Sequence, residues 1–474
     1  MSTDHIQNIK ELLKKEGYPD DNQIIPLPSS GSNRSYYRII FLNNNNHTSL
    51  IASYNYDVRE NIAQNSFTMH FKSLGFNVPE IFARDSNYRY FLMQDIGDTT
   101  LFKLLSNDRD KALKYYKDVI TDLIKFQVVG IKGLDIEVAY PIKKFDKRSI
   151  MWDLNYFKYY FVKPHNIIFD ENTLEDNFEK FADILLNTEL EYFNYRDFQS
   201  RNIMIHNDSL WYIDFQGGRQ GPLQYDLVSL LYQAKANLSA EIRDILYNHY
   251  LETLNNILPG KQDMFEESYL YFIYFRLMQV TGAYGFRGLV QRKAHFLQSI
   301  PMAINSLFDL MQKSPLRSDF SELNNVFNQI SELNYQQISN SNNGLTVNIN
   351  SFSFKKKGIP SDISGNGGGH VFDCRSLPNP GRFAELRDYT GLQQPIINYL
   401  EELKEVDDFL SNSKKIINQS IDNYLERNFN SLQINFGCTG GRHRSVYSAS
   451  RIAEYIKNKY PEVNVEVRHM EIDD

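Results

Sequence analysis

The middle of this sequence reads Asn194-Tyr195-Arg196-Asp197-Phe198-Gln199-Ser200-Arg201-Asn202, and Ile213-Asp214-Phe215 follows shortly after it. We predict a polar loop over the first segment and then two short apolar strands, Ile203–Ile205 and Leu210–Ile213. The residues between these strands, His206-Asn207-Asp208, are typical of a turn. A polar loop, a hairpin and a carboxylate after the second strand form the layout of a phosphoryl-transfer centre.

The spacing of three polar residues indicates a role for each. Asp197 is expected to bind the acceptor hydroxyl and take its proton, while Asn202 and Asp214 are expected to bind Mg²⁺. The loop carries the base and then an amide, and one hairpin brings a carboxylate back to the same metal. The plainer alternative is an Asp/Asn-rich turn in which these side chains only cap the backbone.

Length and composition limit the class of protein. A chain of 474 residues is too long for one ordinary core, so we expect two or three domains. Its 42% hydrophobic and 23% charged residues are typical of a folded protein, and its net charge of −7 argues against extensive nonspecific nucleic-acid binding. The cysteines Cys374 and Cys438 cannot form a disulfide framework, and no signal peptide or spanning segment is evident. We therefore expect a cytoplasmic protein without a membrane partner.

Residues 1–95 are expected to form a small β-rich nucleotide-binding lobe. A polar tip at 29–35 is followed by strands at 36–42 and 50–54 and by a helix over about 60–74. Small residues in this tip let backbone N–H groups approach the phosphates of a nucleotide. The residues expected to bind the nucleotide are Gly31, Ser32, Asn33 and Arg34 in the tip, and Gln94 where this lobe joins the next.

Helical periodicity dominates residues 96–317, which are expected to form a helical catalytic lobe. Within it, Asp226 is expected to have a structural role, either capping a helix or bracing the catalytic loop. Residues 318–344 are polar and end in an Asn/Ser-rich segment, which predicts a helical bridge and a linker. A separate α/β domain is expected over 345–474, beginning with an alternating strand at 345–354.

This last domain contains a strand at 432–436, a glycine-bearing loop and a helix at 446–457. Such a succession makes an anion site, because free N–H groups and the helix dipole both favour negative charge at a helix N-terminus. The residues expected to bind a phosphate are Thr439, Gly440, Gly441, His443, Arg444 and Ser445. The alternative is a glycine-rich turn whose basic side chains lie in solvent.

Cys438 and Arg444 also have the Cys-x5-Arg-Ser spacing of cysteine-dependent phosphatases, in which a thiolate attacks the bound phosphate. A general acid is not evident, and Asp373 and Asp388 are the candidates. Phosphatase activity is therefore a minor alternative for this domain.

Residues 20–310 resemble the aminoglycoside phosphotransferase family of kinase-like enzymes, and most of all its AmgK-type amino-sugar kinases. The resemblance is carried by the stretches at 31–38, 92–98, 195–202, 214–217 and 221–231. It implies a bilobal α+β kinase-like fold, ATP and Mg²⁺ as cofactors, and the roles given above for Asp197, Asn202 and Asp214. It also implies phosphorylation of N-acetylmuramate or N-acetylglucosamine at the anomeric hydroxyl.

Two positions depart from the family pattern. Tyr195 stands where the family usually has a histidine, and we expect it to replace the packing of that ring. The strand at 50–54 lacks the lysine that clamps nucleotide phosphates in protein kinases. Either Arg34 or Arg38 substitutes for it, or ATP is held through metal and backbone. The main alternative is a regulatory pseudokinase, an adaptor that binds RNA or a metabolite.

Residues 345–470 closely resemble the C-terminal domain of RapZ, an RNase adaptor protein. The matching stretches are 351–355, 371–380, 385–387, 390–391 and 437–447. The resemblance implies a domain that binds glucosamine 6-phosphate and that binds a small RNA in that family, with a homo-oligomer through this domain as a further expectation. Acidic and basic residues are nearly equal in number here, which favours the sugar phosphate over RNA. We therefore expect an amino-sugar kinase fused to a sugar-phosphate-binding domain.

Overall fold

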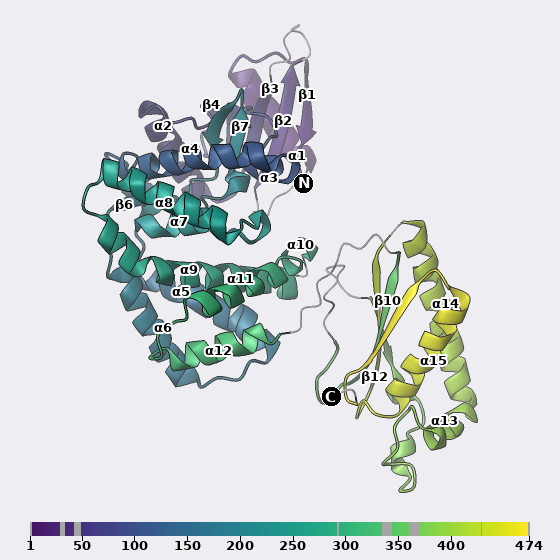
Figure 1. Cartoon of the computed structure of the whole chain (residues 1–474). Coiled ribbons are helices and arrows are strands. Elements are labelled where there is room, and N and C mark those ends of the chain that lie inside the picture. Colours follow the sequence, from purple (N-terminus) through teal and green to yellow (C-terminus); the bar gives the residue numbers. More distant parts are fainter. Residues whose placement is uncertain are drawn as a thin grey trace. The chain divides into compact units, whose positions relative to one another are not determined.

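The computed structural model describes residues 2–28, 34–41, 49–291, 293–333, 344–360, 362, 369–427 and 429–472. It contains two compact units, which are described separately (Figure 1). The first unit comprises Met1–Gly282 and Met302–Glu332, and the second comprises Ala283–Pro301 and Leu333–Asp474. The predicted nucleotide-binding residues Gly31, Ser32 and Asn33 and most of the predicted linker lie outside the described residues.

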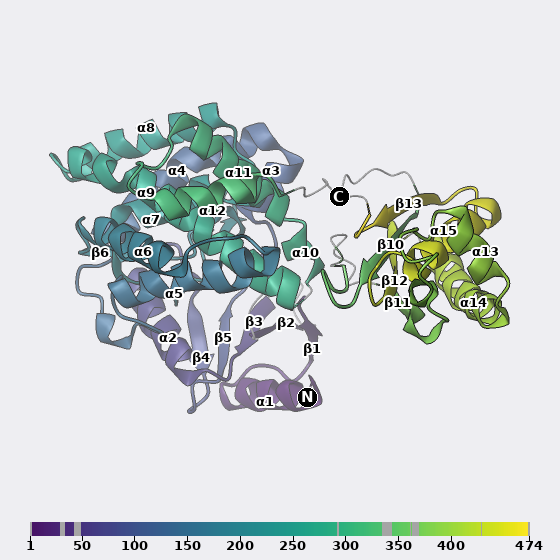
Figure 2. The ribbon, with the colours of Figure 1, turned by 90° about the horizontal axis from the view of Figure 1, so that it is seen from below.

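The first unit begins with an antiparallel five-stranded sheet in the order β1-β2-β3-β5-β4. Its strands are β1 (Asn22–Pro26), β2 (Ser35–Phe41), β3 (Ser49–Tyr54), β4 (Ile81–Arg84) and β5 (Tyr90–Gln94). Alternation along β2 turns Tyr37, Ile39 and Phe41 toward Ile9 and Leu13 of α1 (Ser2–Lys15), which covers one face of the sheet (Figure 2). Helix α2 (Val58–Ser73) follows β3 and begins at the N-cap Asp57.

The rest of the first unit is mainly helical, as predicted. Its helices are α3 (Leu101–Asn107), α4 (Arg109–Val128), α5 (Lys147–Phe157), α6 (Glu171–Leu186), α7 (Leu223–Leu231), α8 (Ala240–Ile257), α9 (Gln262–Tyr284), α11 (Ile300–Lys313) and α12 (Ser321–Ser331). Leu323, Val326, Phe327 and Ile330 of α12 are buried, and the helix packs against α6. Because this spacing gives the helix an apolar face, α12 is part of the first unit and not the bridge that its polar composition predicts.

The predicted hairpin is present between α6 and α7. β7 (Ile203–His206) pairs with β8 (Ser209–Tyr212), and the turn residues Asn207 and Asp208 both have positive φ, as a tight two-residue hairpin turn requires. A second pair, β6 (Tyr192–Asn194) and β9 (Arg219–Gly221), flanks the predicted polar loop and the hairpin. Phe71 of α2 packs edge-on against Phe126, Phe193 and Phe215 with ring centroids 5.1–5.3 Å apart. These rings attach α2 to the residue after Asp214.

The second unit contains a parallel sheet in the order β11-β12-β10-β13. Its strands are β10 (Thr346–Ser353), β11 (Gly369–Asp373), β12 (Ser431–Cys438) and β13 (Asn464–His469). The helices α13 (Gln394–Glu401), α14 (Lys404–Glu426) and α15 (Arg444–Lys459) cover one face of it (Figures 1 and 2). The short helix α10 (Ala294–Leu297) also belongs to this unit. Among the described residues, every helix is too short or too polar to cross a lipid bilayer.

Candidate functional site

The predicted catalytic loop, residues 195–202, is held in place by the buried carboxylate of Asp226. Asp226 lies on α7, all of whose residues are buried, and it accepts hydrogen bonds from the backbone N–H groups of Tyr195 (2.7 Å) and Arg196 (2.8 Å). These bonds fix Arg196 at a positive φ of 75°, which a non-glycine residue rarely adopts. Asp226 is therefore a brace for the loop, in agreement with the structural role predicted from the sequence.

Tyr195 supports the same loop from inside the core. The ring is 1% exposed, and its hydroxyl donates a 2.7 Å hydrogen bond to the carbonyl of Ile213, the residue before Asp214. Tyr195 thus links the catalytic loop to the end of the hairpin. This contact agrees with the expectation that Tyr195 packs as a structural support.

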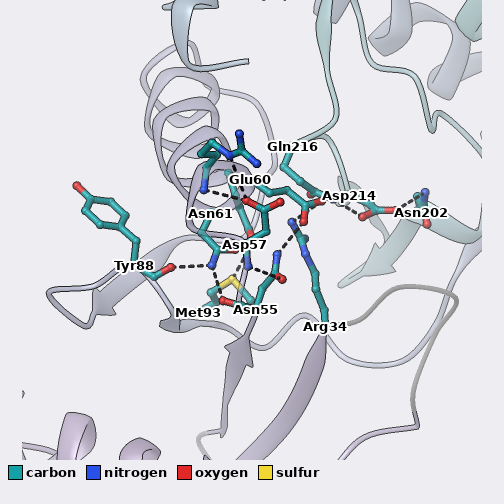
Figure 3. A network of polar contacts seen from close by, with 12 residues as sticks. Arg34, Asn55, Asp57, Glu60, Asn61, Tyr88, Met93, Asn202, Asp214 and Gln216 are labelled. Atoms are coloured by element: carbon teal, nitrogen blue, oxygen red, sulfur yellow. Dashed lines mark hydrogen bonds and ion pairs between the residues drawn. The ribbon is translucent and has the colours of Figure 1, made fainter. Parts of the chain in front are cut away.

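The residues predicted to hold the acceptor and the metal lie together, and Figure 3 shows Asn202 beside Asp214. The amide Nδ2 of Asn202 donates to the backbone carbonyl of Asp197 (2.8 Å) and to Oδ2 of Asp214 (3.2 Å). Gln216 donates to the other carboxylate oxygen of Asp214 at 2.7 Å. The hairpin therefore returns Asp214 to the loop, as the spacing predicts.

The two carboxylates have opposite electrostatic environments. Burial acts to raise the pKa of Asp197, but the positive charges of Arg196 and Arg276 outweigh it and hold that pKa below its usual value. The pKa of Asp214 is raised, first by burial and then by the negative charge of Asp197. The carboxylate of Asp197 is thus kept ionised, and a cation beside Asp214 would relieve the repulsion.

This donor set fits Mg²⁺. The described residues contain no group of three or more His, Cys, Asp or Glu side chains that could hold a metal ion alone. Mg²⁺ commonly takes only one or two protein oxygens and completes its shell with water and nucleotide phosphates. The carboxylate of Asp214 and the side-chain amide oxygen of Asn202 are oxygen donors of this kind.

Arg34, one of the two arginines predicted to replace the missing lysine, contacts helix α2. Its guanidinium forms a 3.1 Å ion pair with Glu60 of α2, which also accepts a 2.7 Å hydrogen bond from Asn55. Arg34 is 5% exposed, and it points toward Glu60 and Asp214 (Figure 3). This ion pair has the composition of the Lys–Glu pair between a strand and a helix in protein kinases, although the cation precedes β2 instead of lying on β3.

Arg38, the other residue predicted to replace the missing lysine, binds two carboxylates outside this site. Its guanidinium donates to the carboxylates of Asp95 and Asp98 at 2.6–3.1 Å, which joins β2 to the segment after β5. Both carboxylates have lowered pKa values, with Arg38 as the stabilising charge. Gln94, which was predicted to bind the nucleotide, accepts a hydrogen bond from the backbone N–H of Glu80 through its side-chain oxygen (3.4 Å). Arg38 therefore fixes the link between the lobes, and Arg34 is the arginine that faces the site.

The predicted anion loop of the second unit lies at the carboxyl end of β12 and leads into α15. The thiol of Cys438 is 3% exposed, accepts from the N–H of Gly441 (3.2 Å) and lies 3.1 Å from the hydroxyl of Ser445. Gly441 has a φ of +71°, and a Cβ there would lie 2.3 Å from Glu471, so glycine is required. The loop therefore curls around the sulfur at the N-terminus of a 16-residue helix.

The basic residues of this loop differ from the expected arrangement. Nη1 of Arg444 donates to the carbonyls of Arg375 (3.1 Å) and Leu377 (2.8 Å), and the side chain is buried. Its Nε has no hydrogen-bond partner among the described residues. His443 contacts the carbonyl of Arg387 at 3.2 Å. Arg444 is thus first a brace for the short helix Cys374–Ser376 and the residue after it.

Comparison with known proteins agrees with this division of the chain. Residues 25–261, half of the chain, match the model of the phosphotransferase enzyme family. The chain belongs to this family. Residues 345–473 match the RapZ C-terminal domain, so a kinase-like domain is followed by a domain of that type.

Curated relatives match the second part. A nucleotide-binding protein of Actinobacillus pleuropneumoniae serotype 5b is 30% identical over 188 residues, which are 38% of this chain and 63% of the relative. One from Staphylococcus epidermidis is 43% identical over 124 residues, 26% of this chain and 39% of the relative. The chain thus spans less than two thirds of the length of these relatives.

Solved structures match the first part. A choline kinase from Cryptosporidium parvum is 13% identical, with a TM-score of 0.46, and the match covers 68% of this chain and 99% of that one. The aminoglycoside phosphotransferase APH(4)-Ia is also 13% identical, with a TM-score of 0.40, over 63% of this chain and 97% of that one.

The brace formed by Asp226 gives a prediction for stability. Burial raises the pKa of Asp226 from 3.8 to about 7, against the lowering effect of the two backbone N–H groups. The folded state binds this proton more tightly than the unfolded state. The free energy of unfolding should therefore fall by about 1.4 kcal/mol for each pH unit as pH rises from about 4 to 7. Asp226→Asn should lack this component, as urea unfolding at pH 5 and pH 8 would measure. Asp208→Asn, in the exposed hairpin turn, should keep it; an unchanged pH difference in Asp226→Asn would contradict the prediction.

Proposed function

We propose that the first unit is an ATP- and Mg²⁺-dependent phosphotransferase that phosphorylates a hydroxyl of an amino sugar, of the N-acetylmuramate or N-acetylglucosamine type. The observation that carries the proposal is the meeting of Asp197, Asn202 and Asp214, with the Arg34–Glu60 pair directed at the same point. Positioning and electrostatic stabilisation supply most of the catalysis in phosphoryl transfer, so these groups suffice for the reaction.

Each side chain has its own task in this proposal. Asp197, kept ionised by its arginine neighbours, holds the acceptor hydroxyl and takes its proton. Asn202 and Asp214 would hold Mg²⁺, which when bound neutralises charge on the nucleotide phosphates. Arg34, oriented by Glu60, supplies a fixed positive charge for the same phosphates.

The test is ADP formation by the full-length protein with a panel of amino sugars. Sugar-dependent ADP formation with Mg²⁺ supports the proposal. ATP binding without turnover on any sugar would favour the regulatory alternative, in which a silent kinase lobe controls the state of the second unit.

For the second unit we infer that the loop 438–445 binds the phosphate of an amino-sugar phosphate, with RNA as the less favoured ligand. The N-terminus of α15 directs N–H groups at this loop, with the helix dipole favouring an anion. We further propose a domain boundary near residue 344, a homo-oligomer through this domain and a cytoplasmic location. Both cysteines of the chain are free and buried, which is compatible with a reducing compartment.

Replacing Cys438 by serine separates binding from phosphatase chemistry. The sulfur accepts the N–H of Gly441, a bond that a serine oxygen can also accept, so the Kd for glucosamine 6-phosphate should change by less than about threefold. Calorimetry and a phosphate-release assay measure the two properties.

Of the candidates for the general acid of a phosphatase, Asp373 is paired with Arg375 (2.6 Å), which holds its pKa below the usual value and makes it a poor proton donor. Phosphate release by the wild type that Cys438→Ser abolishes would instead establish a phosphatase.

A further inference from the structure

Beside Asp197 lies a cluster of three arginines, two of which keep its carboxylate ionised in the proposed reaction and the third of which has no task there. Arg196 comes from the catalytic loop, Arg219 from β9 and Arg276 from α9. Register between β6 and β9 sets Arg219 opposite Asn194, three residues before Asp197. The charges of all three guanidinium groups act on the carboxylate of Asp197, and the strand register keeps Arg219 near the loop that carries it.

Two of the arginines have hydrogen-bond partners within the cluster. Arg276 donates to the hydroxyl of Tyr225 (3.2 Å) and to the amide oxygen of Gln279 (2.5 Å), and Arg196 also bonds to Tyr225. Gln279 in turn donates to Asp153 of α5 at 2.6 Å. These bonds join α5, α7, α9 and the catalytic loop into one polar wall.

Arg219 is the exception. It is 4% exposed, and its Nε and Nη2 have no hydrogen-bond partner among the described residues. A buried charged donor without a partner is costly unless a ligand or water satisfies it. Its surroundings also disfavour its positive charge: burial and the nearby positive charge of Arg196 lower the pKa of Arg219 to about 10.

The charges of the cluster do not balance. Three guanidinium groups face two carboxylates, Asp153 and Asp197, and the second of these is committed to the acceptor hydroxyl in the proposed reaction. Arg196, Asp197, Asp153 and Gln279 are only partly buried, so this polar wall reaches solvent. An anionic group on that molecule would satisfy Arg219 and restore neutrality.

We propose that Arg219, with Arg196 and Arg276 beside it, binds an anionic group of the acceptor, so that the acceptor is a hydroxylated acid and not a neutral sugar. This inference rests on the proposed phosphotransferase function. The shared chemistry is a carboxylate or a phosphate, since planar guanidinium groups bind both through paired N–H donors.

The test uses acceptors that differ in one charged group. With the full-length protein, kcat/KM is measured for N-acetylglucosamine, for N-acetylmuramate, which adds a carboxylate, and for N-acetylglucosamine 6-phosphate, which adds a phosphate. At least one charged acceptor should exceed the neutral one by about tenfold or more in the wild type, and its identity tells which anion is bound. In Arg219→Gln that preference should fall to within about threefold, while Arg219→Lys should keep part of it.

Arg243→Gln on α8, which removes an arginine stacked on Tyr232, is the matched control and should keep the wild-type preference. Wild-type preference for the neutral sugar would overturn the inference without affecting the proposed function. An equal loss of kcat/KM for all three acceptors in Arg219→Gln would overturn it too, because Arg219 would then serve the transferred phosphoryl group or the fold. If no acceptor turns over, the proposed function fails, and calorimetry with N-acetylmuramate decides the inference: binding by the wild type and not by Arg219→Gln supports it, and equal or absent binding overturns it.

Discussion

Replacing Asp197 by alanine is expected to lower kcat by at least about a hundredfold, the usual scale for loss of a general base. The carboxylate is kept ionised by Arg196 and Arg276, so the wild type presents a base at neutral pH. Nucleotide binding should change little, because the Kd for ATP depends on Arg34 and on the metal ligands. Steady-state kinetics with the best amino sugar, together with calorimetry of ATP binding, measure the two quantities.

Two other aspartates make this result specific. Asp208→Asn, in the exposed turn of the β7–β8 hairpin, should keep wild-type kcat, because asparagine tolerates the positive φ of that position. Asp214→Ala should weaken Mg²⁺–nucleotide binding as well as turnover. Wild-type turnover in Asp197→Ala would show that another group is the base.

The second large effect concerns Arg34. Arg34→Met should raise the KM for ATP by about ten- to a hundredfold, the scale of one or two lost hydrogen bonds to a charged group. Glu60→Gln should reproduce part of this effect, because the 3.1 Å ion pair orients the guanidinium. Kinetics with varied ATP at saturating sugar provide the measurement.

A neighbouring arginine provides the control for that experiment. Arg59 lies on the same helix as Glu60, but its side chain is 74% exposed and contacts Asp57 (3.8 Å) and the hydroxyl of Tyr140 (3.0 Å) instead of Glu60. The KM of Arg59→Met for ATP should stay within about twofold of the wild type. Equal KM values for Arg34→Met and the wild type would mean that backbone and metal alone hold the phosphates.

Local patterns in the sequence predicted the elements whose parts are neighbours along the chain. The hairpin after the catalytic loop is specified by two apolar runs and an Asn-Asp turn, and it brings Asp214 back to Asn202 as expected. The loop between β12 and α15 is likewise recognised from its glycines and the helix that follows.

Contacts between segments that lie far apart in the sequence were harder to predict from it. A choice between Arg34 and Arg38 depends on which side of β2 each one faces and on partners, Glu60 and Asp95, that lie far along the chain. The polar wall around Arg219 draws on four separate elements, and no spacing in the sequence marks it. Arg444 was expected to face phosphate, but the carbonyls that its Nη1 contacts belong to a segment about seventy residues earlier.

Helix α2 has a consequence for how ATP and metal bind. It carries Glu60, which orients Arg34, and Phe71, whose ring packs 5.3 Å from that of Phe215, next to Asp214. A shift of this one helix would displace the proposed phosphate-binding arginine and the proposed metal ligand together. The two sites are therefore expected to bind with positive cooperativity, and by thermodynamic linkage Mg²⁺ should raise the affinity for ATP by the same factor by which ATP raises the affinity for Mg²⁺.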